Sequence, residues 1–138
     1  MKSIVIDTNV IVSALKSRLG ASNKLLTLIG TKKFELSTST SLILEYEDVI
    51  KRLLKNFTIK QIDNFLDYIC MESRHITISY LWRPVLKNPN DELVLELAVA
   101  AKADYIITYN VKDFFGIEKF GIKTLTPKEF LQLIGEIK

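Results

Sequence analysis

The feature that most constrains the fold is the alternation of short β-branched segments with longer amphipathic ones. SIVI (residues 3–6) and DYIIT (104–108) are short and rich in isoleucine and valine, as strands buried on both faces are. Segments of helical period, such as 41–56, stand between them. Alternating strands and helices predict a parallel sheet covered by helices on both faces. The predicted fold class is therefore α/β.

The element boundaries follow from periodicity and from capping signals. Strands are expected at residues 3–6, 34–39, 75–79, 104–108 and 122–126. Helices are expected at residues 10–19, 22–30, 41–56, 58–72, 91–103 and 127–137. Thr58 with Gln61, and Thr126 with Glu129, have the spacing of capping boxes. Since no linker or repeat interrupts the 138 residues, we expect a single domain, 1–138, with a mostly parallel sheet of four to five strands.

Composition excludes several classes of protein. An apolar fraction of 48% with 25% charged residues is that of a soluble globular chain, and no apolar run is long enough to span a bilayer. No secretory signal pattern opens the sequence. The single cysteine, Cys70, forms no disulfide within the chain, and no Cys/His cluster is present to bind zinc. We therefore expect a cytoplasmic protein without a membrane partner. The net charge of +3 permits a nucleic-acid partner without indicating one.

One acid of the helix at 41–56 lacks an ordinary surface role. Glu47 precedes Lys51 by four residues and Asp48 precedes Arg52 by four, so both acids are expected to form helical ion pairs. Glu45 has no basic residue at such a position, and it borders the apolar face of the helix. A partly buried, unpaired carboxylate is costly, so Glu45 is a candidate for function.

Three other acids stand at element ends, and each has a local explanation. Asp7 follows the first strand and could cap the next helix, Asp91 opens a helix, and Asp113 lies in a turn after the strand at 104–108. In a parallel α/β sheet, however, strand carboxyl ends and helix amino ends meet at one edge, where such folds bind ligands. If the first strand lies beside the fourth, these acids and Glu45 converge. Converging carboxylates without His or Cys favour Mg²⁺ or Mn²⁺, and such a site suits phosphodiester hydrolysis.

Four stretches, taken in order, resemble the successive motifs of PIN (PilT N-terminal) domain ribonucleases, in particular the VapC-like toxins. They are IDTNVIVSAL, SLILEYEDVI, NPNDELVLELAVAAKADYIIT and TYNVKDF. The resemblance implies a Rossmann-like sheet and Mg²⁺- or Mn²⁺-dependent cleavage of RNA. It also implies a small antitoxin as partner and, commonly, a homodimer.

The resemblance also assigns residues. Asp7, Glu45 and Asp91 match the first three catalytic acids, and Asp7 and Asp91 are the expected metal ligands. Thr108 matches the hydroxyl residue before the fourth acid, and it is expected to position substrate or water together with Asn9 and Asn110.

The fourth acid departs from a common form of the pattern. Many relatives read T-x-D, whereas this chain has Asn110 at that place and Asp113 three residues later. Either Asp113 supplies the fourth catalytic carboxylate, or Asn110 orients a water or a phosphate. Three matched acids suffice for one metal ion, and the departure leaves the number of metals open.

Several further residues carry two interpretations. His75 is expected to be structural, and Cys70 to fill a core or half-buried position. An aromatic loop could stack on RNA bases or pack against protein, and a basic stripe could bind phosphates or be an ordinary solvated face. The loop residues are Tyr80, Trp82 and Arg83, and the basic residues are Lys32, Lys33, Lys51, Arg52 and Lys55.

The leading hypothesis is a metal-dependent endoribonuclease, the toxin of a prokaryotic toxin–antitoxin pair. The alternative is a catalytically silent PIN-like module that binds RNA or protein, which the departure at the fourth acid favours. A generic Rossmann-like ligand binder has no support, since no glycine-rich phosphate loop follows the first strand.

Overall fold

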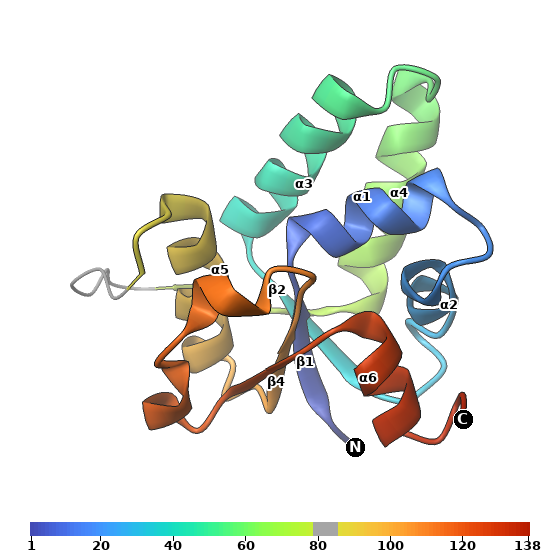
Figure 1. The fold of residues 1–138 in the computed structure, drawn as a ribbon. Coiled ribbons are helices and arrows are strands. Elements are labelled where there is room, and N and C mark those ends of the chain that lie inside the picture. The colour runs from blue at the N-terminus through green and yellow to red at the C-terminus, as the bar shows by residue number, and fades with distance from the viewer. Residues whose placement is uncertain (79–85) are drawn as a thin grey trace.

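Five parallel strands lie side by side in the order β3–β2–β1–β4–β5 in the computed structural model, which describes residues 1–78 and 86–138 (Figure 1). Every neighbouring pair is parallel, so the predicted α/β class with a parallel sheet is confirmed. The strands are β1 (Ser3–Ile6), β2 (Glu35–Thr38), β3 (Arg74–His75), β4 (Tyr105–Ile107) and β5 (Lys123–Leu125). The first strand therefore pairs with the fourth, as the convergence of the acids requires.

The central strand β1 is buried on both faces because helices cover the sheet. Ile4, Val5 and Ile6 are all fully buried. In the register, Ile4 lies opposite Tyr105 and Ile6 opposite Ile107. This register holds the carboxyl ends of β1 and β4 level with each other.

Within residues 1–78 and 86–138, six α-helices and two short 3₁₀ helices accompany the strands. The α-helices are α1 (Thr8–Lys16), α2 (Ala21–Thr27), α3 (Thr40–Leu53), α4 (Ile59–Glu72), α5 (Pro89–Ala100) and α6 (Pro127–Leu133). The 3₁₀ helices η1 (Val111–Phe114) and η2 (Ile117–Phe120) follow β4. Helix α5 packs against β1, β2 and β4, whereas α2 contacts α1 and α6. Figure 1 shows α3 and α4 as an antiparallel pair that extends away from the sheet.

Two predicted capping boxes are present and fix where α4 and α6 begin. The Thr58 hydroxyl accepts from the Gln61 N–H at 3.1 Å, and the Gln61 side chain accepts from the Thr58 N–H at 2.8 Å. Thr126 and Glu129 exchange the same two bonds at 3.2 and 2.9 Å. These reciprocal bonds satisfy amide groups that a helix start otherwise leaves unpaired.

Several predicted boundaries were shifted. Helix α5 begins at Pro89, because Asn88 caps it through the N–H of Asn90 at 2.8 Å, and it ends at Ala100 instead of 103. Helix α3 ends at Leu53 rather than at residue 56, and Leu53 is half-exposed although its helical spacing from Leu42 and Tyr46 predicts that it shares their apolar face. The last turn of α3 extends past the sheet, so that this position has less of the core to cover.

The burial predicted for Cys70 was wrong, because this cysteine is exposed on α4. The core-facing residues of that helix are Ile62, Leu66 and Ile69, and Cys70 projects from another side. His75 lies in β3 as expected, exposed, with its Nε2 3.3 Å from the Thr40 hydroxyl. The strand predicted at 75–79 is limited to Arg74–His75, and residue 79 lies outside the described residues.

Tyr80, Trp82 and Arg83, the predicted aromatic loop, also lie outside the described residues. Within residues 1–78 and 86–138, no helix has both the length and the apolar character to cross a bilayer.

Candidate functional site

The carboxyl ends of β1 and β4 bring two distant segments of the chain together. Asp7 follows β1, and Thr108 follows β4, which pairs directly with β1. The pairing continues for one residue past the strand end, since the Asp7 N–H donates to the Ile107 carbonyl at 2.9 Å. Side chains 101 positions apart in sequence therefore lie within hydrogen-bond distance at this edge of the sheet.

Asp7 is held in place by hydrogen bonds to both of its carboxylate oxygens. Its Oδ1 accepts from the Thr8 N–H at 2.8 Å, so Asp7 is the N-cap of α1. Its Oδ2 accepts from the Thr108 hydroxyl at 2.8 Å. The residue is 7% exposed. The capping role and a role in a site are thus compatible, because the cap occupies one oxygen and fixes the direction of the other.

Thr108 and Asn9 extend this network. Thr108 is fully buried, and its hydroxyl accepts from the Asn110 N–H at 3.0 Å while it donates to Asp7. The Asn9 amide nitrogen lies 3.4 Å from both Asp7 Oδ2 and the Thr108 hydroxyl, and its oxygen accepts from the Tyr109 N–H at 3.3 Å. The turn after β4 is therefore tied to the start of α1.

Glu45 reaches the same edge from α3. Its Oε2 accepts from the Thr8 hydroxyl at 2.6 Å, and it forms no ion pair within the described residues. The next residue, Tyr46, is fully buried, and its hydroxyl donates to the Ile6 carbonyl. The two bonds attach α3 to the end of β1 on either side of Asp7.

Asp91 is the third residue of α5 and is 8% exposed. No hydrogen bond or ion pair involves its carboxylate within the described part of the chain. It shares a cleft of about 290 Å³ with the acids already described. The cleft, called the acid cleft below, is lined by Asp7, Glu45, Asp91, Asn9, Asn88 and Asn110, among others.

The acid cleft carries negative charge, and no basic residue lines it within the described part of the chain. Burial raises the pKa of Asp91 to about 6, and the charges of Asp7, Asp113 and Glu45 contribute to the rise. Burial also raises the pKa of Asp7, although the hydrogen bonds from Thr108 and Thr8 oppose the rise. The neighbouring charges thus make ionisation of Asp7 and Asp91 harder, and a bound cation would relieve this cost.

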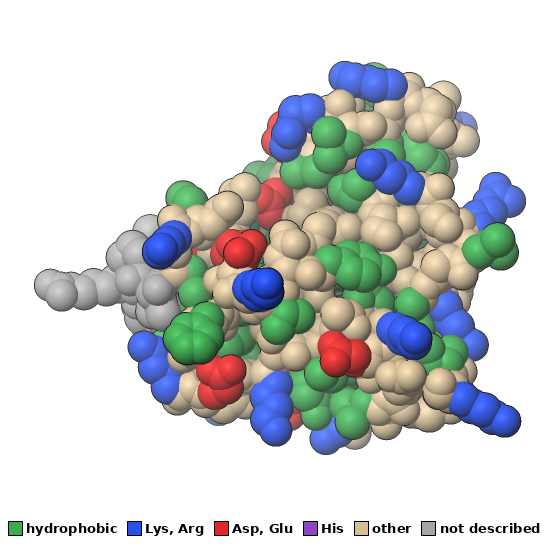
Figure 2. Space-filling view, in the orientation of Figure 1, with side chains coloured by type: hydrophobic (Ala, Val, Ile, Leu, Met, Phe, Trp, Pro, Cys, Tyr) green, Lys and Arg blue, Asp and Glu red, His purple; other side chains and the backbone are tan. Residues whose placement is uncertain are grey.

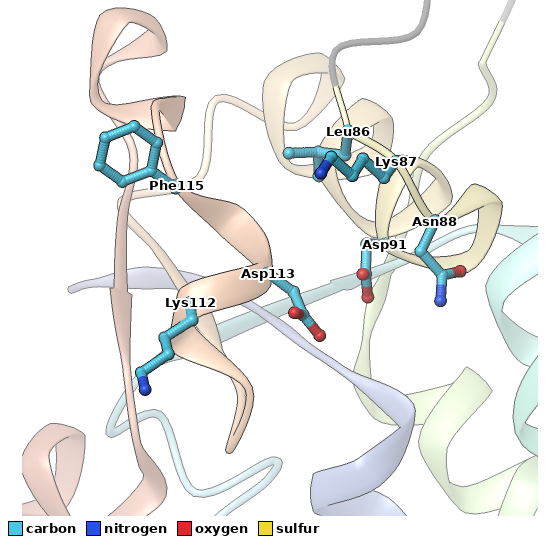
Figure 3. Close-up of a pocket in the computed structure, with 7 residues that line it drawn as sticks. All are labelled: Leu86, Lys87, Asn88, Asp91, Lys112, Asp113 and Phe115. Atoms are coloured by element: carbon cyan, nitrogen blue, oxygen red, sulfur yellow. The ribbon is translucent and has the colours of Figure 1, made fainter.

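The two candidates for the role of the fourth catalytic acid, Asn110 and Asp113, both follow β4 but line different clefts. Asn110 is exposed and lines the acid cleft. Asp113 is exposed on η1 and lines an adjoining cleft of about 450 Å³, together with Asp91. Figure 3 shows the Asp91 and Asp113 carboxylates on facing sides of that second cleft, one from α5 and one from η1. Asp91 therefore borders both clefts.

The residues of the acid cleft fit a hard divalent cation by their chemistry. The available donors are carboxylate and amide oxygens, which suit Mg²⁺ or Mn²⁺. Within residues 1–78 and 86–138, no three His, Cys, Asp or Glu side chains are close enough together to form a ready metal-binding group. Among the acids that line the acid cleft, Asp7 and Asp91 are those whose pKa burial raises.

Sequence reasoning missed several contributors to this region. The hydroxyl of Thr8 donates to Glu45, a contact that the sequence did not predict. Asn88 lines both clefts, and Lys87 and Lys112 line the second. The signal for Asn88 was its place one residue before Pro89, which marks a helix cap and hence the sheet edge. The hydroxyl contact depends on the approach of α1 and α3 and has no local signal.

The predicted basic stripe is not assembled. Lys51 and Arg52 pair with Glu47 and Asp48 at 3.2 and 3.9 Å, the helical pairs that the spacing predicts. Lys32 and Lys33 precede β2, at the sheet edge opposite the acids, and Lys33 pairs with Glu136 at 3.3 Å. Lys55 follows α3 and is exposed. Figure 2 shows Lys and Arg side chains scattered over the visible face, as a solvated surface has them.

A parallel α/β sheet with acids gathered at its carboxyl edge defines a Rossmann-like class of proteins with an acidic cleft. A sequence profile of the PIN domain matches residues 3–112, most of the chain, and the chain belongs to the PIN domain family. The matched segment contains Asp7, Glu45 and Asp91 and ends one residue before Asp113.

Solved structures of low sequence identity share the fold. VapBC2 from Rickettsia felis, solved bound to a DNA fragment from its promoter, is 16% identical with a TM-score of 0.61, over 90% of this chain and 98% of that one. VapBC-1 from nontypeable Haemophilus influenzae is 17% identical with a TM-score of 0.59, over 91% of this chain and 98% of that one. Among curated proteins, no sequence matches the chain.

Proposed function

We propose that this protein is a metal-dependent endoribonuclease that hydrolyses RNA phosphodiester bonds, and that it is the toxin of a prokaryotic toxin–antitoxin pair. The observation that carries the proposal is the acid cleft. Asp7, Glu45 and Asp91 come from three separate elements and line one cleft, and the pKa of Asp91 is raised to about 6 by burial and neighbouring acids. A nuclease site requires this excess of carboxylate charge to hold a divalent cation beside a phosphate.

The proposed roles follow from how each side chain is held. Asp7 and Asp91 are the metal ligands for Mg²⁺ or Mn²⁺, which when bound would activate a water and neutralise charge on the scissile phosphate. Thr108 and Asn9 fix the orientation of the Asp7 carboxylate. Glu45, fixed through Oε2 by Thr8, provides an acceptor for the proton that the attacking water loses.

The fourth position is assigned by its electrostatic effect. The charge of Asp113 contributes to the raised pKa of both Asp7 and Asp91, so we assign Asp113 as the fourth catalytic acid. Asn110, which lines the acid cleft, is assigned to orient water or a phosphate oxygen.

The partner assignment rests on the family and on the similar structures. Both similar structures are of VapBC proteins, and the motifs of this chain resemble those of VapC-like toxins. We therefore propose a small antitoxin protein as the partner, RNA as the substrate and the cytoplasm as the site of action. A homodimer is a further expectation from the family.

RNA cleavage with and without metal tests the proposal. The chain is expected to cut RNA in Mg²⁺ or Mn²⁺, to stop on addition of EDTA, and to lose activity in Asp7→Asn. Asp63→Asn is the matched control, because it removes an exposed carboxylate of α4 far along the chain from the site. Cleavage by Asp7→Asn at the parent's rate would contradict the proposed site.

A catalytically silent RNA- or protein-binding module is the second candidate. It is favoured by the lack of a ready three-acid group within the described residues and by Asn110 at the fourth position. RNA binding without turnover in Mg²⁺ and in Mn²⁺ would establish this second function in place of the first.

A further inference from the structure

The second cleft, between the start of α5 and η1, joins the acid cleft and differs from it in character. Its walls carry two lysines and an aromatic ring besides the two carboxylates. They include Lys87, Asn88, Asp91, Lys112, Asp113 and Phe115. Asn88 and Asp91 line both clefts, so the two clefts are adjacent. A volume of about 450 Å³ lies within the range of clefts that take small ligands (about 300–1,000 Å³). It is called the side cleft below.

Phe115 is unusual for a large apolar side chain. It is 89% exposed, whereas the preceding Phe114 is 1% exposed and belongs to the core. The ring follows the end of η1 and lies on the same wall as Lys112 (Figure 3). It contributes no burial to the fold, and its position on the rim of a charged cleft gives it a face open to a planar ligand.

Lys87 and Lys112 provide cations on the two walls of the side cleft. Neither forms an ion pair within the described residues, although both line the cleft that contains Asp91 and Asp113. In Figure 3 the Lys112 ammonium points away from the two carboxylates. These lysines are therefore available to an anion that enters from outside, in contrast to Lys51 and Arg52, which are paired on α3.

A planar ring and two free cations beside a proposed phosphodiester site match the chemistry of one nucleotide. Aromatic rings bind unpaired bases by stacking, and lysines bind backbone phosphates. A base inside a duplex has no face free for such a ring. Resting on the proposed nuclease function, we propose that the side cleft is the subsite for an unpaired nucleotide next to the scissile bond, with its base on Phe115 and with Lys87 and Lys112 contacting the backbone phosphates beside it.

The proposal assigns specificity to residues that take no part in the bond cleavage. Phe115 selects RNA that is single-stranded at the cut and tolerates different bases, because every base has a face that can stack. Lys87 and Lys112 contribute affinity that is independent of sequence and falls with salt.

Binding of a fluorescent single-stranded RNA of mixed sequence tests the subsite. It is measured by anisotropy on the Asp7→Asn background with Mg²⁺, so that the readout needs no cleavage. Phe115→Ala is expected to weaken binding roughly 5- to 100-fold, and Phe115→Tyr to retain it. Lys112→Ala is expected to weaken binding and to reduce its salt dependence. Leu19→Ala, at a side chain 99% exposed after α1, and Lys128→Ala, at an exposed lysine of α6, are the controls and bind as the background does.

The proposed subsite can be contradicted independently of the proposed nuclease function. If the parent chain cleaves RNA but Phe115→Ala binds the single strand as tightly as the background, the subsite is wrong and the nuclease remains. Equal loss of affinity for a fully paired duplex of the same length would also overturn it, because a stacked base must be unpaired. A background protein that does not bind the single strand overturns the subsite as well.

Discussion

Asp7 and Asp113 both follow buried strands that end at the same edge of the sheet, yet only the Asp7 carboxylate is fixed by hydrogen bonds. Asp7 is 7% exposed and accepts hydrogen bonds on both oxygens, from Thr8 and Thr108. Asp113 is exposed on η1, and no hydrogen bond of its side chain is found within the described residues. A strand end brings an acid to the edge, and hydrogen bonding then decides whether its carboxylate has a fixed direction.

The contrast suggests two kinds of contribution to one site. The Asp7 carboxylate is preorganised by its hydrogen bonds, as its proposed role as a metal ligand requires. Asp113 acts through its charge, which contributes to the raised pKa of Asp7 and of Asp91 without a fixed contact. The side cleft is lined by Asp113, and its walls carry lysines and an aromatic ring besides carboxylates.

The largest expected effect is the difference between Asp7→Asn and Asp113→Asn. Asp7→Asn keeps the shape and the cap but removes the charge, so we expect roughly a thousandfold loss of RNA cleavage, equivalent to several kcal/mol. Asp113→Asn removes a charge from an exposed and unsupported position, and about a tenfold loss is expected. Initial rates of cleavage in Mn²⁺ measure both. Equal losses in the two variants would show that burial and hydrogen bonding do not distinguish the acids.

Asn110→Ala tests which of Asn110 and Asp113 has the role of the fourth catalytic acid. If Asp113 is the fourth acid, Asn110→Ala loses less activity than Asp113→Asn. The reverse order would assign the fourth role to Asn110, which lines the acid cleft directly.

Thr108→Val tests whether the hydrogen bond from the Thr108 hydroxyl supports the Asp7 carboxylate, because it removes the hydroxyl and preserves the shape of the side chain. The fully buried hydroxyl donates to Asp7 and accepts from the Asn110 N–H. We expect the free energy of unfolding to fall by about 1–3 kcal/mol and cleavage to fall about 10- to 100-fold. Urea unfolding and initial rates measure these changes. Thr124→Val, at a half-exposed position of β5, is the matched control. Cleavage by Thr108→Val at the rate of that control would show that Asp7 needs no such support.

Substitution of Asp91 is expected to change stability less than Thr108→Val does and in the opposite direction, because it should stabilise the metal-free protein. The pKa of this acid is about 6 in the folded chain and about 3.9 in an unfolded one, so the folded state holds the proton more tightly. Its contribution to the free energy of unfolding therefore falls as pH rises from about 4 to about 6. Asp91→Asn is therefore expected to stabilise the metal-free protein by about 1–2 kcal/mol at pH 7, since solvent at the mouth of the cleft screens part of the full effect. The same substitution is expected to abolish cleavage.

Urea unfolding of the parent and of Asp91→Asn, at pH 4 and at pH 7, measures this difference. The stabilisation should be present at pH 7 and nearly absent at pH 4, and Asp63→Asn should show neither. A variant that is less stable than the parent at pH 7 would mean that the Asp91 carboxylate is satisfied in the folded chain.

Much of the fold and of the acid cleft could be predicted because their signals are local. The β-branched segment at residues 3–6 and the capping boxes at Thr58 and Thr126 appeared where they were expected. Asp7, Glu45 and Asp91 were placed at one edge by topology alone, on the condition that the first and fourth strands pair, which they do.

What the sequence did not predict depends on contacts between distant elements. The Thr8–Glu45 bond joins residues 37 positions apart, and the Thr108–Asp7 bond joins residues 101 apart, so no spacing rule applies to either. Cys70 was misplaced because a helical stripe gives only the average direction of the core, and α4 turns this residue to solvent. The side cleft went unseen because it needs η1, a short 3₁₀ helix with no periodic signal.

The most direct test of the central claim, that the acids of the cleft form one electrostatic unit able to hold a cation, is an NMR titration of the Asp91 carboxyl. In the metal-free parent we expect a pKa of about 6, since burial and the charges of Asp7, Asp113 and Glu45 all raise it. The pKa should fall in Asp7→Asn, and it should fall further in the parent when Mg²⁺ is added. An ordinary pKa near 3.8 that neither Asp7→Asn nor Mg²⁺ changes would contradict the account.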